Sequence, residues 1–246
     1  MFAERTYQAA FEYLGIPVGT EYGCTFIESG VLTPLLNGVV GFDCPEDLEE
    51  KAIQEISRHF QKRGLPHMWL IPSQRHQRGV IELLQQQKLS LQGKFFCMQL
   101  HASNSIASAG LSIERVHDGR LFDEWALQLC SNFAMEEDAA KAFAKLLLRG
   151  GLTGSFHHLA GIFDGKMVST ASVLLQPQGA YIFNLTTQPE YRRRGFATAM
   201  MQRCIECACS FGKMEIALFS SQEAVSLYQK LGFTCVNSYE VYMSFT

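Results

Sequence analysis

The sequence lacks several features that would assign it to a membrane, secretory or nucleic-acid-binding class. No apolar run is long enough to cross a membrane as a helix, and the first residues lack the pattern of a secretory signal peptide. The net charge is only −3, so the chain has no basic excess that would attract nucleic acids. We therefore expect a cytoplasmic protein whose partners are neither membranes nor nucleic acids.

The chain also lacks the cysteine spacing of a zinc site or a disulfide framework, although it contains eight cysteines. Cys204, Cys207 and Cys209 crowd one predicted helix, but their spacing places them on different faces, and no second Cys/His pair accompanies them. Because no export signal is evident, we expect reduced thiols. The sequence therefore predicts no metal site.

The chain does have a large apolar fraction and one distinctive stretch, Ala180–Phe211. Hydrophobic residues make up 47% of the 246 residues, which suits one large domain or two small ones. An apolar run predicts a strand over 180–187, and Pro189 ends it because proline lacks the N–H that a strand needs. A helix with apolar residues on one face is predicted after Gly195.

The loop between this strand and this helix is a candidate anion site. A glycine at the mouth of a helix leaves backbone N–H groups unpaired at the positive end of the helix dipole. Arg192, Arg193 and Arg194 add guanidinium donors that suit phosphate. The alternative at this level is an ordinary strand–turn–helix unit with a solvated basic patch.

Two segments at a suitable spacing resemble a known family. Arg192-Arg193-Arg194-Gly195-Phe196-Ala197 resembles motif A of the GNAT (Gcn5-related N-acetyltransferase) superfamily, which reads Gln/Arg-x-x-Gly-x-Gly/Ala. Ala224–Phe233 resembles motif B, Ala-x-x-Leu-Tyr-x-Lys-Leu-Gly-Phe. The resemblance covers roughly the second half of the chain. It implies the GNAT fold, an α/β (α+β) fold with a mixed, mostly antiparallel sheet flanked by helices, and acetyl-CoA as the cosubstrate.

The resemblance also implies roles for individual residues. Leu185 and Thr187 would offer backbone groups to the pantetheine arm, and a backbone amide near Leu185 would stabilise the oxyanion. The N–H groups from Arg193 to Thr198 would hold the pyrophosphate. Ser221 stands where relatives often carry an asparagine, and its hydroxyl could bond the cofactor instead. The implied cofactor-binding residues are Leu185, Thr186, Thr187, Arg192, Arg193, Arg194, Gly195, Phe196, Ala197, Thr198, Ser221 and Ala224.

Tyr228 is the predicted catalytic residue. It occupies the place where the family commonly has a general acid for the departing thiolate. A phenol with a pKa of about 10 is protonated at neutral pH and can supply that proton. The alternative is a core aromatic residue at the end of a helix.

The sequence identifies no general base. The predicted strand at 180–188 contains no carboxylate. His157 and His158 lie in a predicted hairpin strand, where only one of them can face a cleft, and we expect both to be structural. Asn184 and Thr186 could position a water relay. An amine that arrives already deprotonated would need no base.

The two halves of the chain resemble distant repeats of each other. Residues 64–73 align with 212–221, and Leu84 aligns with Tyr228. The first half contains no Arg-x-x-Gly-x-Ala segment, so it is expected to lack a cofactor site. Chance similarity between short apolar strands is the alternative explanation.

This alignment predicts three parts. We expect residues 1–101 to form a degenerate GNAT-like domain, 102–110 to form a small, polar linker, and 111–246 to form the catalytic GNAT domain. The first half also resembles the N-terminal half of two-lobed bacterial acetyltransferases. By the same resemblance, helices predicted at 122–133 and 136–148 would line the side of the acceptor substrate.

The sequence thus predicts an acetyl-CoA-dependent N-acetyltransferase that moves an acetyl group directly to a primary amine of a small molecule or a peptide. We expect a monomer or a homodimer. The alternative is a catalytically inactive acyl-CoA-binding module used for sensing or assembly. The intact motif together with Tyr228 favours the enzyme, because a scaffold has no need of an acid. Nucleotide binding is disfavoured because no Gly-Lys-Ser/Thr follows the loop.

Overall fold

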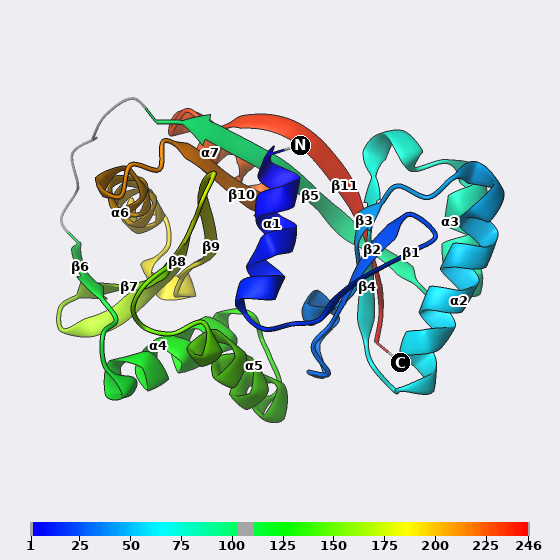
Figure 1. The fold of residues 1–246 in the computed structure, drawn as a ribbon. Coiled ribbons are helices and arrows are strands. Elements are labelled where there is room, and N and C mark those ends of the chain that lie inside the picture. Colours follow the sequence, from blue (N-terminus) through cyan, green and yellow to red (C-terminus); the bar gives the residue numbers. More distant parts are fainter. Residues whose placement is uncertain (1, 103–110, 246) are drawn as a thin grey trace.

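The computed structural model describes residues 2–102 and 111–245, so the predicted linker lies outside the described residues except for Ala102. The described strands form one sheet with the order β1-β2-β3-β4-β11-β5-β10-β9-β8-β7-β6 (Figure 1). The strands are β1 (Val18–Glu21), β2 (Cys24–Glu28), β3 (Asn37–Phe42), β4 (His67–Pro72), β5 (Ser90–His101), β6 (Ser112–Arg115), β7 (Phe156–Phe163), β8 (Lys166–Gln176), β9 (Gly179–Thr187), β10 (Glu215–Ser221) and β11 (Thr234–Ser244). The helices are α1 (Phe2–Tyr13), α2 (Glu49–Lys62), α3 (Arg78–Gln86), α4 (Gly119–Asn132), α5 (Glu137–Arg149), α6 (Phe196–Ser210) and α7 (Val225–Lys230).

The sheet is mixed and mostly antiparallel, as the sequence predicts. Among the described strands, only the neighbouring pairs β3–β4 and β9–β10 run parallel. Strands β7 and β8 form a hairpin whose turn contains Asp164 and Gly165. Their φ angles of 50° and 74° give the left-handed backbone that a two-residue hairpin turn requires.

Helices cover both faces of the sheet. Along β9, side chains alternate between two cores: Tyr181 packs in the core that contains α1, α4 and α5, whereas Ile182 packs in the core that contains α6 and α7. A third core, around Phe60 and Trp69, lies beneath α2 and α3. In the part of the chain that the structure describes, no helix is long and apolar enough to span a bilayer.

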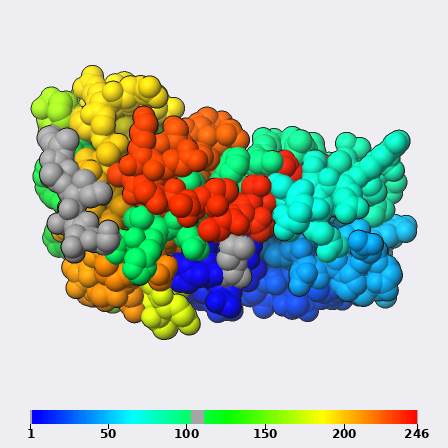
Figure 2. All heavy atoms as spheres, turned by 90° about the horizontal axis from the view of Figure 1, so that it is seen from above, coloured from blue at the N-terminus to red at the C-terminus, as the bar shows by residue number. Residues whose placement is uncertain are grey.

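The last strands of the two halves are exchanged. We call residues 2–102 the N-terminal lobe and residues 111–245 the C-terminal lobe. Strand β5 of the N-terminal lobe pairs with β10 of the C-terminal lobe, and β11 of the C-terminal lobe pairs with β4 of the N-terminal lobe. Strands β5 and β11 also pair with each other. Figure 1 shows both strands crossing the molecule, and Figure 2 shows the C-terminal residues, in red, at its centre. This exchange crosses the predicted domain boundary, and the division into separate domains stays a prediction.

Helix α1 lies where the two lobes meet. It belongs to the N-terminal lobe, yet it packs against β9 and β10 of the C-terminal lobe (Figure 1). Tyr7 stacks on Phe219 of β10, with 4.2 Å between the ring centroids, and also contacts Tyr181 of β9. The first helix of the chain therefore covers part of the C-terminal lobe.

Candidate active site

The parallel strands β9 and β10 separate early. Their described pairing comprises only Ala180 with Ile216 and Tyr181 with Ala217, although both strands continue beyond these pairs. Further along β9, Asn184 has a φ of 57°, and the pairing register with β8 shifts next to it. This bulge bends β9 away from its straight course. The result is a gap in the sheet between the ends of β9 and β10.

Backbone groups of β9 point into this gap. The amide of Gln188 donates to Val168 on β8. Because backbone groups alternate in direction along a strand, those of Thr187 and Leu185 face away from β8 and toward the gap. The carbonyl of Thr187 accepts a hydrogen bond from the Nε atom of Arg192, 3.1 Å away. The backbone of Leu185 and the amide of Thr187 are therefore available for an extended ligand.

The three arginines of the loop have different surroundings. Arg192 holds the end of β9 through Thr187, as described above. Arg194 lies over the rings of Tyr191 and Phe163, with its guanidinium carbon 5.4 and 5.8 Å from their centroids. Arg193 is exposed and has a φ of 63°. Only the first of the three contributes to the groove described below.

Gly195 is the N-terminal cap of α6. Its φ of 83° lies in the left-handed region, and a Cβ atom built there would meet no protein atom within 4 Å. The amides of the first helical turn, from Phe196 onward, have no intrahelical acceptor. Gly195 thus leaves open space in front of a helix N-terminus, where an anion is stabilised.

A groove of about 300 Å³ runs along the gap. It brings together seven of the predicted site residues with three that the sequence did not identify. Its lining consists of Asn132, Phe133, Leu185, Thr186, Thr187, Arg192, Ala197, Ala224, Leu227 and Tyr228. Of the remaining predicted residues, Arg193, Arg194, Gly195, Phe196 and Thr198 do not line this groove, and Ser221 lines the neighbouring cavity.

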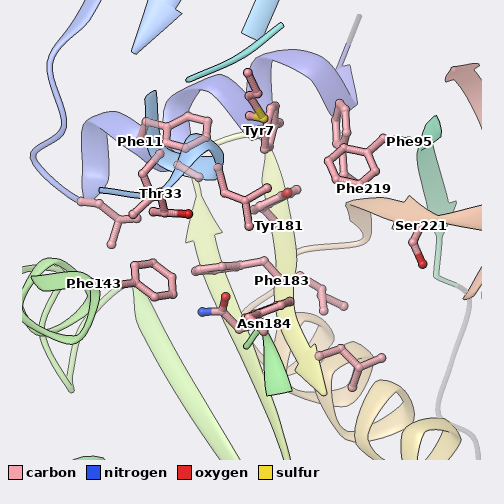
Figure 3. Close-up of a pocket in the computed structure, with 18 of the residues that line it drawn as sticks. Tyr7, Phe11, Thr33, Phe95, Phe143, Tyr181, Phe183, Asn184, Phe219 and Ser221 are labelled. Atoms are coloured by element: carbon pink, nitrogen blue, oxygen red, sulfur yellow. The ribbon is translucent and has the colours of Figure 1, made fainter. Parts of the chain in front are cut away.

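That neighbouring cavity, which we call the interlobe pocket, has a volume of about 320 Å³ (Figure 3). It is enclosed by α1, by the segment before β3, by the α4–α5 connection and the middle of α5, by β4, β5, β9 and β10, and by α7 with the turn before it. Its lining consists of Tyr7, Ala10, Phe11, Leu14, Thr33, Leu35, Leu36, Met68, Phe95, Phe133, Met135, Phe143, Tyr181, Ile182, Phe183, Asn184, Leu185, Phe219, Ser221, Ala224 and Tyr228. Both lobes therefore build it.

Tyr228 lies where the groove and the interlobe pocket meet. It lines both, as do Leu185, Ala224 and Phe133. The side chain is 7% exposed and packs edge-on against Phe233. Burial raises the pKa of the Tyr228 phenol above its usual value, so the hydroxyl stays protonated at physiological pH. The geometry therefore presents a protonated hydroxyl at the junction.

Ser221 lies at the end of β10, on the wall of the interlobe pocket. Its hydroxyl donates a hydrogen bond to the carboxylate of Glu223, and this bond lowers the pKa of that carboxyl group. The Ser221 hydroxyl can therefore reach a ligand only by sharing or leaving this internal bond.

The two histidines of β7 line neither cavity. His158 is fully buried, and its Nδ1 atom lies 2.9 Å from the hydroxyl of Ser172, which in turn accepts from the amide of Asn184. Burial lowers the pKa of His158 to about 4, so it is neutral at physiological pH. On the opposite face, His157 packs against Phe211, and burial lowers its pKa as well. His158 thus holds Asn184 indirectly and does not itself reach the pocket.

Sequence reasoning missed the N-terminal wall of the interlobe pocket. Tyr7 and Phe11 lie on the apolar face of α1, and an apolar helix face does not indicate which lobe the helix covers. Phe133 and Phe143 come from the two helices that were expected on the acceptor side. A stronger signal was not present, because pocket walls are made by tertiary packing.

Comparisons with known proteins identify similar sequences and a similar fold. Residues 121–233 match the model of a family described as "Acetyltransferase (GNAT) family". The chain is 30% identical over 76 residues to a glucosamine 6-phosphate N-acetyltransferase of Trypanosoma brucei brucei, an alignment that covers 28% of this chain and 52% of the relative. The chain thus spans about half the length of this curated relative.

Solved structures share the fold over nearly the whole chain. One described as a GCN5-related N-acetyltransferase from Kribbella flavida has a TM-score of 0.69 and 13% identity, with 98% of this chain and 95% of that chain covered. Another of the same description, from Sphaerobacter thermophilus, has a TM-score of 0.69 and 13% identity, with 98% and 90% covered. At this identity the likeness concerns the fold alone.

Proposed function

We propose that this chain, whose residues 121–233 match the acetyltransferase (GNAT) family model, transfers an acetyl group from acetyl-CoA directly to a primary amine. The observation that carries the proposal is the junction at Tyr228. There, a groove that ends at a helix N-terminus meets a second cavity, and Tyr228, Leu185 and Ala224 line both. Two substrates can therefore meet at a single point.

The groove suits coenzyme A. Leu185 and Thr187 present backbone groups that can pair with the amides of the pantetheine arm in the manner of an added strand. The N-terminus of α6, open in front of Gly195, suits the pyrophosphate. Arg193, which is exposed beside this N-terminus, adds positive charge. The thioester of the bound cofactor would then lie close to Tyr228.

The transfer needs two contributions from the chain. The amine nitrogen attacks the thioester carbon, and the backbone amide of Leu185 stabilises the negative charge that develops on the carbonyl oxygen. As the carbon–sulfur bond breaks, the hydroxyl of Tyr228 donates to the departing sulfur. The proton that the amine loses balances the proton that the thiolate gains.

The raised pKa of Tyr228 defines its role more closely. A phenol whose pKa lies above its usual value is a weaker acid than a thiol, so complete proton transfer to the thiolate is unfavourable without a replacement proton. Tyr228 therefore acts as a hydrogen-bond donor in the transition state and passes on the amine's proton. We propose no general base, because no carboxylate or histidine of the described chain lines the junction.

The second candidate is a cofactor-binding module without activity. It shares the groove and the helix N-terminus with the enzyme but requires no second cavity. The interlobe pocket, which opens at Tyr228, favours the enzyme because it offers space for an acceptor beside the proposed thioester position. We also propose that the N-terminal lobe binds no cofactor of its own.

Thermal melting followed by a thiol-release assay tests the proposal. Acetyl-CoA and CoA should raise the melting temperature, whereas ATP should not, because only ligands bound by the folded state stabilise it. The Tyr228→Phe variant should show the same shift but release thiol about 100-fold more slowly or worse. The control is Tyr242→Phe, which removes the hydroxyl of a buried tyrosine in β11, outside both cavities. No shift with acetyl-CoA, or unchanged turnover of Tyr228→Phe, would contradict the site or the mechanism, respectively.

A further inference from the structure

The interlobe pocket has an unusual chemical composition for a site that receives an amine. Nine of its lining residues are aromatic, and none of the described residues that line it is an Asp, Glu, Lys, Arg or His. Its polar side chains are limited to Thr33, Asn184, Ser221 and tyrosine hydroxyls. At about 320 Å³, the pocket lies at the lower end of the range for small-molecule sites.

We propose that the acceptor is a small primary amine with an aromatic or similarly apolar body and no other charged group. The amine binds in the interlobe pocket in its neutral form, with its nitrogen next to Leu185 and Tyr228. This proposal rests on the proposed function and adds the substrate class to it.

Because no charged side chain lines the pocket, it does not suit acceptor amines that carry an anionic group as well. A sugar phosphate or an amino acid carries an anion that must be paired with a cation or a set of N–H donors when it leaves water. The described lining offers no such cation. An aromatic body, in contrast, gains from burial against rings such as Phe143, Phe183 and Tyr7.

The same lining determines the protonation state of the amine. The titratable groups that face the pocket are the phenols of Tyr7, Tyr181 and Tyr228, and burial raises the pKa of each, so none carries a negative charge. Glu4 on α1 bonds Tyr239 and Asn237 and does not line the pocket. An ammonium ion would therefore lose its hydration and regain only a small part of that free energy from the ring faces.

Asn184 provides an acceptor that can orient the neutral amine. Its amide nitrogen donates to the hydroxyl of Ser172 at 3.2 Å, and His158 fixes that hydroxyl from behind. Figure 3 shows the amide oxygen of Asn184 directed toward the cavity, with the hydroxyl of Thr33 farther along the wall. An N–H of the amine can donate to this oxygen and leave the nitrogen lone pair free to attack.

A comparison of acceptors tests the proposal at saturating acetyl-CoA. Thiol release is measured with 2-phenylethylamine, glucosamine 6-phosphate and a lysine-containing peptide. The expected kcat/KM for 2-phenylethylamine exceeds that of the other two by at least about tenfold, since burial of a single methylene group already contributes this much. Faster turnover of either charged acceptor would overturn this inference and leave the proposed function intact.

Pocket variants localise the acceptor. Phe143→Ala should raise the KM for 2-phenylethylamine at least about tenfold while the KM for acetyl-CoA stays the same. The matched control is Phe211→Ala, which removes an exposed ring outside the pocket. If Phe143→Ala fails to melt cooperatively, Phe143→Leu keeps most of the volume and should show a smaller change in the same direction. An unchanged KM in a folded variant would place the acceptor elsewhere.

The pH profile is an independent test. Because only the neutral amine binds and the chain supplies no base, log kcat/KM for 2-phenylethylamine should rise with a slope of about 1 between pH 6.5 and 9. An amine attached directly to an aromatic ring is uncharged over this range and should give a flat profile. A plateau near pH 7 with the alkylamine would reveal a protein base and contradict the neutral-binding model.

The choice of acyl donor tests whether the pocket holds the acceptor at all. Preference for octanoyl-CoA over acetyl-CoA would assign the pocket to an acyl chain and overturn this inference.

Discussion

The two lobes contain the same local arrangement but differ at the helix that follows it. In each lobe a pair of parallel strands is joined for two residue pairs and then separates: Gly38–Val39 with Met68–Trp69 in the N-terminal lobe, and Ala180–Tyr181 with Ile216–Ala217 in the C-terminal lobe. A helix follows the first strand of each pair. Leu84 of α3, which is fully buried, aligns in sequence with Tyr228 of α7.

The loops that lead into the two helices carry opposite charge. The loop before α6 contains three arginines and Gly195 with a φ of 83°. The corresponding helix start before and within α2 contains four carboxylates, and one of them, Glu49, is bonded to Arg75. These carboxylates are Glu46, Asp47, Glu49 and Glu50. Carboxylates stabilise a helix N-terminus, but they repel phosphate. The two lobes therefore differ in charge at the helix start where we propose that the C-terminal lobe holds the cofactor.

The largest expected effect comes from separating the lobes. A fragment of residues 111–246 lacks β5, which lies between β10 and β11 in the sheet, and a fragment of residues 1–110 lacks β11 next to β4. Each would expose an unpaired strand edge and an incomplete core. We expect neither fragment to fold alone, as judged by circular dichroism and amide-proton dispersion.

Co-expression of the two fragments is the control. Together they can form every strand pair of the sheet, so they should assemble into a complex that binds acetyl-CoA. A fragment of residues 111–246 that folds alone and binds acetyl-CoA would show that the strand exchange is dispensable and that the two lobes are separable domains.

The elements of the sheet could be read from the sequence, but its strand order could not. The predicted strand at 180–187 and the helix after Gly195 match β9 and α6, because apolar runs, helical spacing and glycine are local signals. Strands β5 and β11 have similar apolar patterns, so neither sequence specifies which lobe it joins. Partner choice depends on contacts between residues more than 100 positions apart.

Some parts of the candidate site have a sequence signature and others do not. The arginine loop and Tyr228 have one, because a few residue types at fixed spacing define them, and their roles stay predictions. The bulge at Asn184 could not be predicted, since a non-glycine residue with a φ of 57° has no reliable signature. The contribution of α1 to the interlobe pocket could not be predicted either, because an amphipathic helix does not specify the surface that it covers.

The next largest expected effect is weaker acetyl-CoA binding in the Gly195→Glu variant, without loss of the fold. A side chain at this position must adopt a strained left-handed backbone, and its carboxylate would occupy the space in front of the α6 N-terminus. Loss of two or more charge-assisted hydrogen bonds together with like-charge repulsion should weaken acetyl-CoA binding at least about 1,000-fold in calorimetry.

The N-terminal lobe offers the matched control, Gly64→Glu. Gly64 follows α2 and has a φ of 63°, and a Cβ atom added there would also meet no protein atom within 4 Å. This variant imposes the same backbone strain and the same charge, far from the cofactor groove. Its affinity for acetyl-CoA should be unchanged, and equal losses in the two variants would attribute the Gly195 effect to general destabilisation.

The smallest effect concerns stability and compares one buried histidine in each lobe. Burial lowers the pKa of His158 to about 4 and also lowers the pKa of His67 in β4. The unfolded chain, with a histidine pKa of about 6.5, therefore binds more protons than the folded chain between these values, and stability falls as the pH decreases through this window. Urea unfolding between pH 7.5 and 5 should show that His158→Gln loses about 2 kcal/mol less than the wild type. His67→Gln should also reduce the dependence of the unfolding free energy on pH. If His158→Gln instead loses as much stability as the wild type over this range, His158 is already charged in the folded protein or reaches water there.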